Sequence, residues 1–421
     1  MQIANLLNVK EEALYLITGL FLNFLTLFAY TNLKQFMGTS LRHLFISVCG
    51  IGTLLFCYGM DSCYLLMSVI SSYFIILLSG SSLIGCLFNC SWLMAFYLYC
   101  IFNYASNDYD ICFTTPLAVM TLRLFGLGID IYDGHQKPSS QDSDRILRLY
   151  NRPSLLEFFS FTLSPFGSLV GPQFSFKDYS HFISDDPKYL GRSRNPMIPL
   201  SLGFFYLLVS IVSQIYMNPL LVISSHFFDY SWLLKIGFIF LFAHLVMCKY
   251  FAVYLIQEAI SAYGCFKPSA GIFLLENVNC LRFELATSIS IIIESFNINT
   301  NRWVKYYVFK RMKFLGSRRL SLLSALTFLA IWHGFHVGYF ECFFLELLYL
   351  ECEKKLANKI SSGKKTFRDF IYALAKYLTT FAICGYALIS FELLLFQRYS
   401  PIYSDLFYMG HIFPAIILIL V

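Results

Sequence analysis

The sequence predicts an all-α polytopic membrane protein, and three observations lead to that class. Of the 421 residues, 57% are hydrophobic and only 13% are charged, whereas soluble domains carry roughly a quarter charged residues. Several apolar runs approach the ~20 residues that an α-helix needs to cross a bilayer. No strand-like alternation is long enough for a barrel. We therefore expect about ten to eleven transmembrane or re-entrant helices, in a single integral-membrane domain that covers residues 1–421.

The expected membrane helices follow one another along the whole chain. Eight apolar runs are long and continuous: Ala13–Tyr30, Leu65–Leu78, Ser82–Phe102, Ile198–Ile215, Trp232–Tyr254, Leu320–Tyr339, Phe370–Leu395 and Leu406–Val421. Three more runs are less continuous: Leu44–Tyr58, Pro116–Ile131 and Leu155–Val170. Glu11 and Glu12 precede the first run and no small-x-small cleavage site follows it, so we expect a retained helix there rather than a signal peptide.

Lysine and arginine gather in two of the polar stretches, residues 295–320 and 351–368. The positive-inside rule places both stretches on the cytoplasmic side of the membrane. The segment between them, Leu320–Leu350, must then cross twice or enter and return, so we expect a bent or long, tilted element. The formal net charge of +6 is mild and indicates no nucleic-acid partner.

The thirteen cysteines lie mostly inside apolar runs. Their number is odd and no CxxC pair occurs among them. We expect buried free thiols rather than disulfides or a zinc site.

Two histidines interrupt the apolar run LAIWHGFHVGYFECFF, residues 329–344. Ionisable groups at membrane depth are costly and commonly face a functional cavity. We expect His333 and His336, at positions i and i+3, to share one face of a helix. They could form hydrogen bonds to neighbouring helices, bind a metal for which no third ligand is evident, or transfer protons. Gly334 and Gly338 form a small-xxx-small step, which lets another backbone approach closely.

A run of asparagines precedes the first basic stretch, in SFNINTNRWVKYYVFKRMKFLG, residues 295–316. We expect a helix that starts near Arg302, with Thr300 or Asn301 as its cap. Asn297 follows an isoleucine-rich segment and is harder to explain as a cap.

Together these two segments resemble the signature of the membrane-bound O-acyltransferase (MBOAT) family. They occur in the family's order, and Asn297 and His333 are 36 positions apart, as in the family's asparagine–histidine pair. NDYDICFTTPLAVMTLRLFGLGIDIYDG, RPSLLEFFSF, LVGPQFSFKDY and YMGHIF are similar to the lysophosphatidylcholine acyltransferase branch. The resemblance extends from about residue 100 to the end of the chain.

The resemblance implies an enzyme of phospholipid remodelling in the endoplasmic reticulum membrane, with helices around a central catalytic chamber. It would transfer a fatty acyl group from acyl-CoA, a co-substrate, to a lysophospholipid hydroxyl, with the sn-2 position of lysophosphatidylcholine as the expected acceptor. No tightly bound cofactor or metal is expected. Two alternatives stay open: a related enzyme that acylates a sterol, diacylglycerol or a protein, and a transporter that relays protons through histidines. The acyl-chain and head-group preferences and the oligomeric state stay undetermined.

The resemblance also assigns roles to individual residues. His333 would accept the proton of the attacking hydroxyl, and Asn297 would orient that hydroxyl or donate to the developing oxyanion. Trp332 and His336 would support the site. Four basic side chains would bind the phosphates of coenzyme A, unless they only mark the cytoplasmic side: Arg302, Lys305, Lys310 and Arg311.

Overall fold

The computed structural model describes residues 10–78, 82–103, 112–136, 146–191, 194–216, 219–268, 275–357 and 367–420. Within these ranges the regular elements are helices, apart from two isolated β-bridges. Seven of the described helices are long and apolar enough to cross a membrane, or eight if one bent pair counts as a span. The prediction of an all-helical, multi-span protein is therefore confirmed, with seven or eight candidate spans in the described part of the chain.

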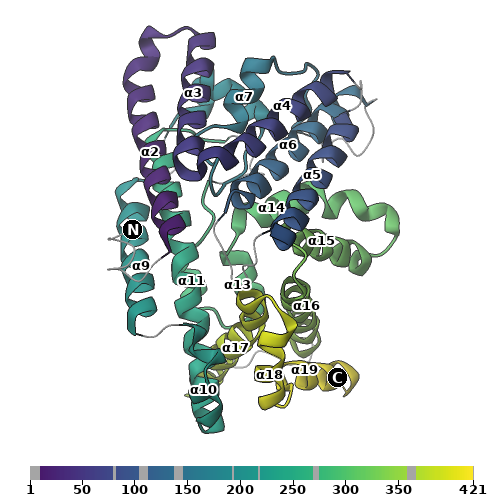
Figure 1. Cartoon of the computed structure of the whole chain (residues 1–421). Helices are drawn as coiled ribbons and strands as arrows, with labels where there is room; N and C mark the ends of the chain where they lie inside the picture. Colours follow the sequence, from purple (N-terminus) through teal and green to yellow (C-terminus); the bar gives the residue numbers. More distant parts are fainter. Residues whose placement is uncertain are drawn as a thin grey trace.

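The first half of the chain forms a bundle around α6. In Figure 1 this bundle occupies the upper part of the molecule. In the membrane-length apolar stretch of α6, 89% of the residues are buried, whereas in that of α5 only 22% are. The helix α6 is therefore central, and α5 lies at the periphery. The helices of this bundle are α2 (Glu11–Leu33), α3 (Thr39–Tyr58), α4 (Ser62–Leu78), α5 (Ser82–Asn103), α6 (Thr114–His135), α7 (Leu155–Thr162) and α8 (Phe176–Ile183).

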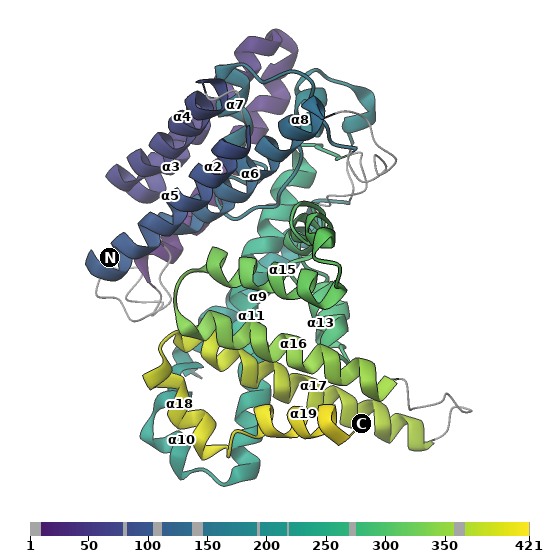
Figure 2. The same ribbon diagram turned by 90° about the vertical axis from the view of Figure 1, so that its right-hand side faces the viewer.

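A second bundle forms below the first, and the long helix α11 (Trp232–Tyr263) connects the two (Figure 2). At 1.5 Å per residue, its 32 residues span about 48 Å. The helix α9 (Met197–Tyr216) packs beside it. The remaining helices are α10 (Ser225–Asp229), α12 (Cys280–Glu284), α13 (Ile289–Ser295), α14 (Ile298–Tyr307), α15 (Arg318–His333), α16 (Val337–Ala357), α17 (Phe367–Leu393), α18 (Phe396–Asp405) and α19 (Met409–Leu420). Short 3₁₀ turns are η1 (Lys34–Phe36), η2 (Gly59–Asp61), η4 (Pro187–Tyr189), η5 (Pro219–Ile223) and η6 (Phe309–Leu315).

The expected helix Leu155–Val170 is wrong, because α7 ends at Thr162 and irregular backbone follows. Pro165 has no N–H to continue a helix. Backbone that is not helical survives at membrane depth only where its polar groups are paired. The buried Arg123 of α6 supplies that pairing, since it donates to the carbonyls of Thr162 (3.2 Å), Gly167 (3.0 Å) and Pro172 (3.0 Å).

The predicted bend between Leu320 and Leu350 is present as a break between α15 and α16. Gly334 has a φ of 137°, a region that favours glycine, and it ends α15 at His333. His336 lies beyond this break, so the expectation that His333 and His336 share a helix face is wrong. Gly338 allows the predicted close approach: a Cβ there would lie 2.0 Å from the Ser390 carbonyl oxygen of α17.

Candidate active site

A chamber of about 1330 Å³ is lined by residues of both bundles. Its walls include residues of α2, α3, α5, α6, α9, α11 and the segment from α12 to α17. Four of the residues singled out in the sequence line it together: Asn297, Trp332, His333 and His336. Residues far apart in the sequence therefore face one cavity.

His333 occupies the C-terminal end of α15 and is surrounded by aromatic rings. Its ring centroid lies 5.5 Å from that of Tyr339, 5.7 Å from Phe343 and 5.2 Å from Phe391. Among the described residues, none makes a hydrogen bond with this imidazole. Both ring nitrogens are thus left for a ligand, in apolar surroundings that favour the neutral form of an imidazole.

Trp332 fixes the end of α15 against the first bundle. Its indole Nε1 donates to the carbonyl of Ala118 on α6 at 2.9 Å, and its own carbonyl accepts from the Tyr97 hydroxyl at 2.5 Å. These two bonds, together with the backbone turn at Gly334, hold the adjacent His333 at the chamber wall.

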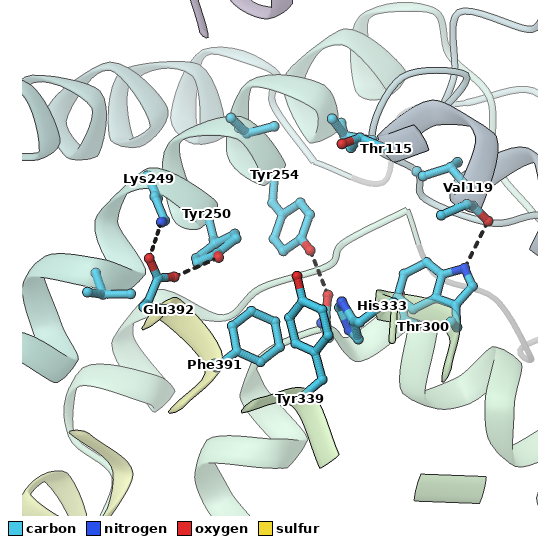
Figure 3. A pocket seen from close by; sticks show the side chains of 18 of the residues that line it. Thr115, Val119, Lys249, Tyr250, Tyr254, Thr300, His333, Tyr339, Phe391 and Glu392 are labelled. Atoms are coloured by element: carbon cyan, nitrogen blue, oxygen red, sulfur yellow. Dashed lines mark hydrogen bonds and ion pairs between the residues drawn. The ribbon is translucent and has the colours of Figure 1, made fainter. Parts of the chain in front are cut away.

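Asn297 stands immediately before α14 in a left-handed conformation, with φ 51° and ψ 35°. It occupies the N-cap position, yet its side chain makes no capping bond. Instead its Oδ1 accepts from the Tyr254 hydroxyl of α11 at 2.8 Å (Figure 3). In this orientation the amide nitrogen, which makes no hydrogen bond to the described residues, can donate to a ligand in the chamber.

The other asparagines anchor this segment. Asn299 is buried and exchanges two hydrogen bonds with the Gln173 backbone, at 2.6 and 2.8 Å. The Asn301 amide donates to the carbonyls of Ile293 and Phe296. The expected start of the helix near Arg302, with Thr300 or Asn301 as cap, is therefore wrong: α14 begins at Ile298.

The four basic side chains expected to bind coenzyme A lie on α14 and η6 and are not among the residues that line the chamber. Arg311 donates to both carboxylate oxygens of Asp133, at 3.0 and 2.6 Å. Lys305 is exposed, Arg302 and Lys310 are half-buried, and the Lys310 ammonium lies 5.9 Å from the Tyr306 ring. Their role toward coenzyme A stays a prediction.

The chamber also contains functional candidates that the sequence reasoning missed. Lys249 of α11 forms an ion pair with Glu392 of α17 (2.6 Å), and the Tyr250 hydroxyl donates to the same carboxylate at 2.9 Å. Figure 3 shows this pair along the same cavity as His333 and Tyr254. The few charges inside the apolar runs Trp232–Tyr254 and Phe370–Leu395, two in each, were the available signal, since such charges are rare at membrane depth.

This arrangement suits transfer of an acyl group within an apolar cavity. A neutral imidazole can accept a proton from a hydroxyl, and an amide donor can stabilise negative charge that develops on a carbonyl oxygen. Across the described ranges, no three His, Cys, Asp or Glu side chains are grouped so that they could hold a metal ion.

Comparisons with known proteins agree with this chemistry. Residues 98–395 match the membrane-bound O-acyltransferase family. Lysophospholipid acyltransferase 5 of Drosophila melanogaster is 30% identical, over 98% of this chain and 87% of its own length. The Homo sapiens protein of that name is 30% identical, over 98% and 89%. Membrane-bound glycerophospholipid O-acyltransferase 2 of Homo sapiens is 25% identical, over 90% and 78%. The chain therefore belongs to the membrane-bound O-acyltransferase family.

Proposed function

We propose that this protein transfers a fatty acyl group from acyl-CoA to the sn-2 hydroxyl of lysophosphatidylcholine. One observation carries the proposal: Asn297 and His333, which are distant in sequence, line the same largely apolar chamber. The two supply the donor and the base that this reaction needs.

In the proposed reaction His333 acts as the general base. The acceptor hydroxyl attacks the thioester carbonyl while its proton passes to the neutral imidazole. The amide of Asn297 donates to the oxygen on which negative charge develops. The carbon–sulfur bond then breaks, the imidazolium returns the proton to the thiolate, and the products are phosphatidylcholine and free coenzyme A.

The acceptor class is supported by the relatives. Those 30% identical along nearly the whole chain are named lysophospholipid acyltransferases, which favours a lysophospholipid over a sterol, diacylglycerol or protein acceptor. Membership of an acyltransferase family likewise favours an enzyme over a transporter that relays protons through histidines. We place the enzyme in the endoplasmic reticulum membrane, with the basic segment of α14 and η6 toward the coenzyme A phosphates.

The test is release of free thiol by the purified protein in lipid nanodiscs, supplied with oleoyl-CoA and one acceptor at a time. Lysophosphatidylcholine, diacylglycerol and cholesterol are compared, with empty nanodiscs as background. We expect thiol release that depends on lysophosphatidylcholine and matches the phosphatidylcholine formed. Turnover with diacylglycerol or cholesterol but not with lysophosphatidylcholine would contradict the proposal.

A further inference from the structure

Among the charged side chains that line the chamber, three come from α11, α16 and α17: Lys249, Glu346 and Glu392, here called the charged cluster. Lys249 and Glu392 form the 2.6 Å ion pair between α11 and α17. The Lys249 side chain is 35% exposed and that of Glu392 11%, so the pair keeps surface that a molecule in the chamber can contact. Catalysis as proposed above uses neither of them.

Glu346 differs from this pair because it stands alone. Within the described part of the chain, its carboxyl has no hydrogen-bond or ion-pair partner. A carboxylate in a largely apolar cavity is costly unless a cation compensates it. Because no cation among the described residues pairs with Glu346, a cationic ligand is the natural complement.

The position of Glu346 relative to His333 is set by α16. Tyr339, Phe343 and Glu346 recur at helical spacing and all line the chamber, so they share one face of the helix. The Tyr339 and Phe343 rings both contact the His333 ring. Glu346 lies three residues after Phe343 and seven after Tyr339, which is about 4.5 and 10 Å along the helix axis. A head group whose glycerol hydroxyl lies at His333 can therefore reach Glu346.

Aromatic rings complete the surroundings of the charged cluster. Tyr250, Tyr349 and Phe391 line the same chamber, and the Tyr250 hydroxyl already donates to Glu392. A quaternary ammonium cannot donate a hydrogen bond, and proteins bind it with ring faces and carboxylates. The chamber offers both kinds of group.

We propose that the charged cluster binds the zwitterionic head group of the acceptor, with its phosphate on Lys249 and its ammonium between Glu346 and Glu392. This inference rests on the proposed function, because it assumes a lysophospholipid acceptor whose hydroxyl is at His333. It adds the basis of head-group selection: the two carboxylates favour acceptors that carry a positive charge beyond the phosphate.

The test compares Glu346→Gln with the unaltered enzyme on two acceptors that carry the same acyl chain. Lysophosphatidylcholine has the ammonium, and lysophosphatidic acid lacks it. We expect kcat/KM for lysophosphatidylcholine to fall about tenfold, and the KM or inhibition constant of lysophosphatidic acid to change less than about twofold or to improve. Glu392→Gln, which keeps its contact with Tyr250, should shift selectivity in the same direction.

Glu351→Gln is the matched control, because Glu351 lies on the same helix but pairs with Lys354 and does not line the chamber. Its selectivity should equal that of the unaltered enzyme. An unchanged ratio between the two acceptors in Glu346→Gln, whether both values fall or neither does, would overturn the inference while leaving the proposed function standing. An unaltered enzyme that acylates no lysophospholipid would refute the proposed function itself.

Discussion

Removing the Tyr254 hydroxyl tests whether this tyrosine orients the Asn297 amide, which we propose as the oxyanion donor. In Tyr254→Phe the ring stays, but the 2.8 Å bond to Asn297 Oδ1 is lost, and the amide is free to rotate. A hydrogen bond of this kind contributes about 0.5–1.5 kcal/mol. Its loss corresponds to about a two- to twelvefold change in the ratio of correctly oriented to misoriented amide. We therefore expect kcat to fall about three- to tenfold, measured as thiol release at saturating acyl-CoA, with little change in KM for either substrate.

The double variant decides how Tyr254 acts. If it works only through Asn297, then Tyr254→Phe adds nothing to the larger loss caused by Asn297→Ala, because residues that act as a unit are not additive. Tyr403→Phe is the control: it removes a buried 3.0 Å bond to the Tyr386 carbonyl away from the chamber, and it should leave kcat unchanged. Losses that multiply in the double variant would refute the positioning role.

Three further predictions concern the surrounding structure. Gly338→Ala should lower the melting temperature and the yield of folded protein sharply, because its Cβ would lie 2.0 Å from a backbone oxygen of α17; a stable variant in thermal unfolding would contradict that packing. We propose that His336, which lies beyond the end of α15, supports the site and does not act as the base, so His336→Ala should lower kcat much less than His333→Ala does in the same assay; equal losses would point to a shared role. Gln substitution of a basic residue that holds coenzyme A should raise KM for acyl-CoA about tenfold, and less at high salt. Arg311→Gln should also destabilise the fold, because it removes the ion pair with Asp133. Four unchanged KM values would mean that the basic residues only mark the cytoplasmic side of the membrane: Arg302, Lys305, Lys310 and Arg311.

The membrane class and the candidate pair Asn297 and His333 could be predicted because both leave signals in short stretches of the sequence. Apolar runs of membrane length identify spans regardless of how they pack. The Gly334–Gly338 step predicted a close helix contact, and Gly338 makes one with α17. The structure also places Asn297 and His333 on the same chamber.

The failed expectations share a physical cause, namely contacts between distant parts of the chain. The segment after Thr162 can stay non-helical inside the bundle because Arg123, more than forty positions earlier, donates to the carbonyls of Gly167 and Pro172. The start of α14 was misplaced because Asn297 adopts a left-handed conformation next to Tyr254 of α11. No local pattern encodes such pairs, and the same holds for the Lys249–Glu392 ion pair across 143 positions.

The measurement that tests the catalytic role of His333 most directly is single-turnover thiol release by His333→Ala, with acyl-CoA binding measured in parallel. We predict that the rate falls by a factor on the order of 10² to 10⁴, as expected when acid–base assistance is lost. Affinity for acyl-CoA and the yield of folded protein should stay close to those of the unaltered enzyme. A near-normal rate in this variant would contradict the assignment of His333 as the base.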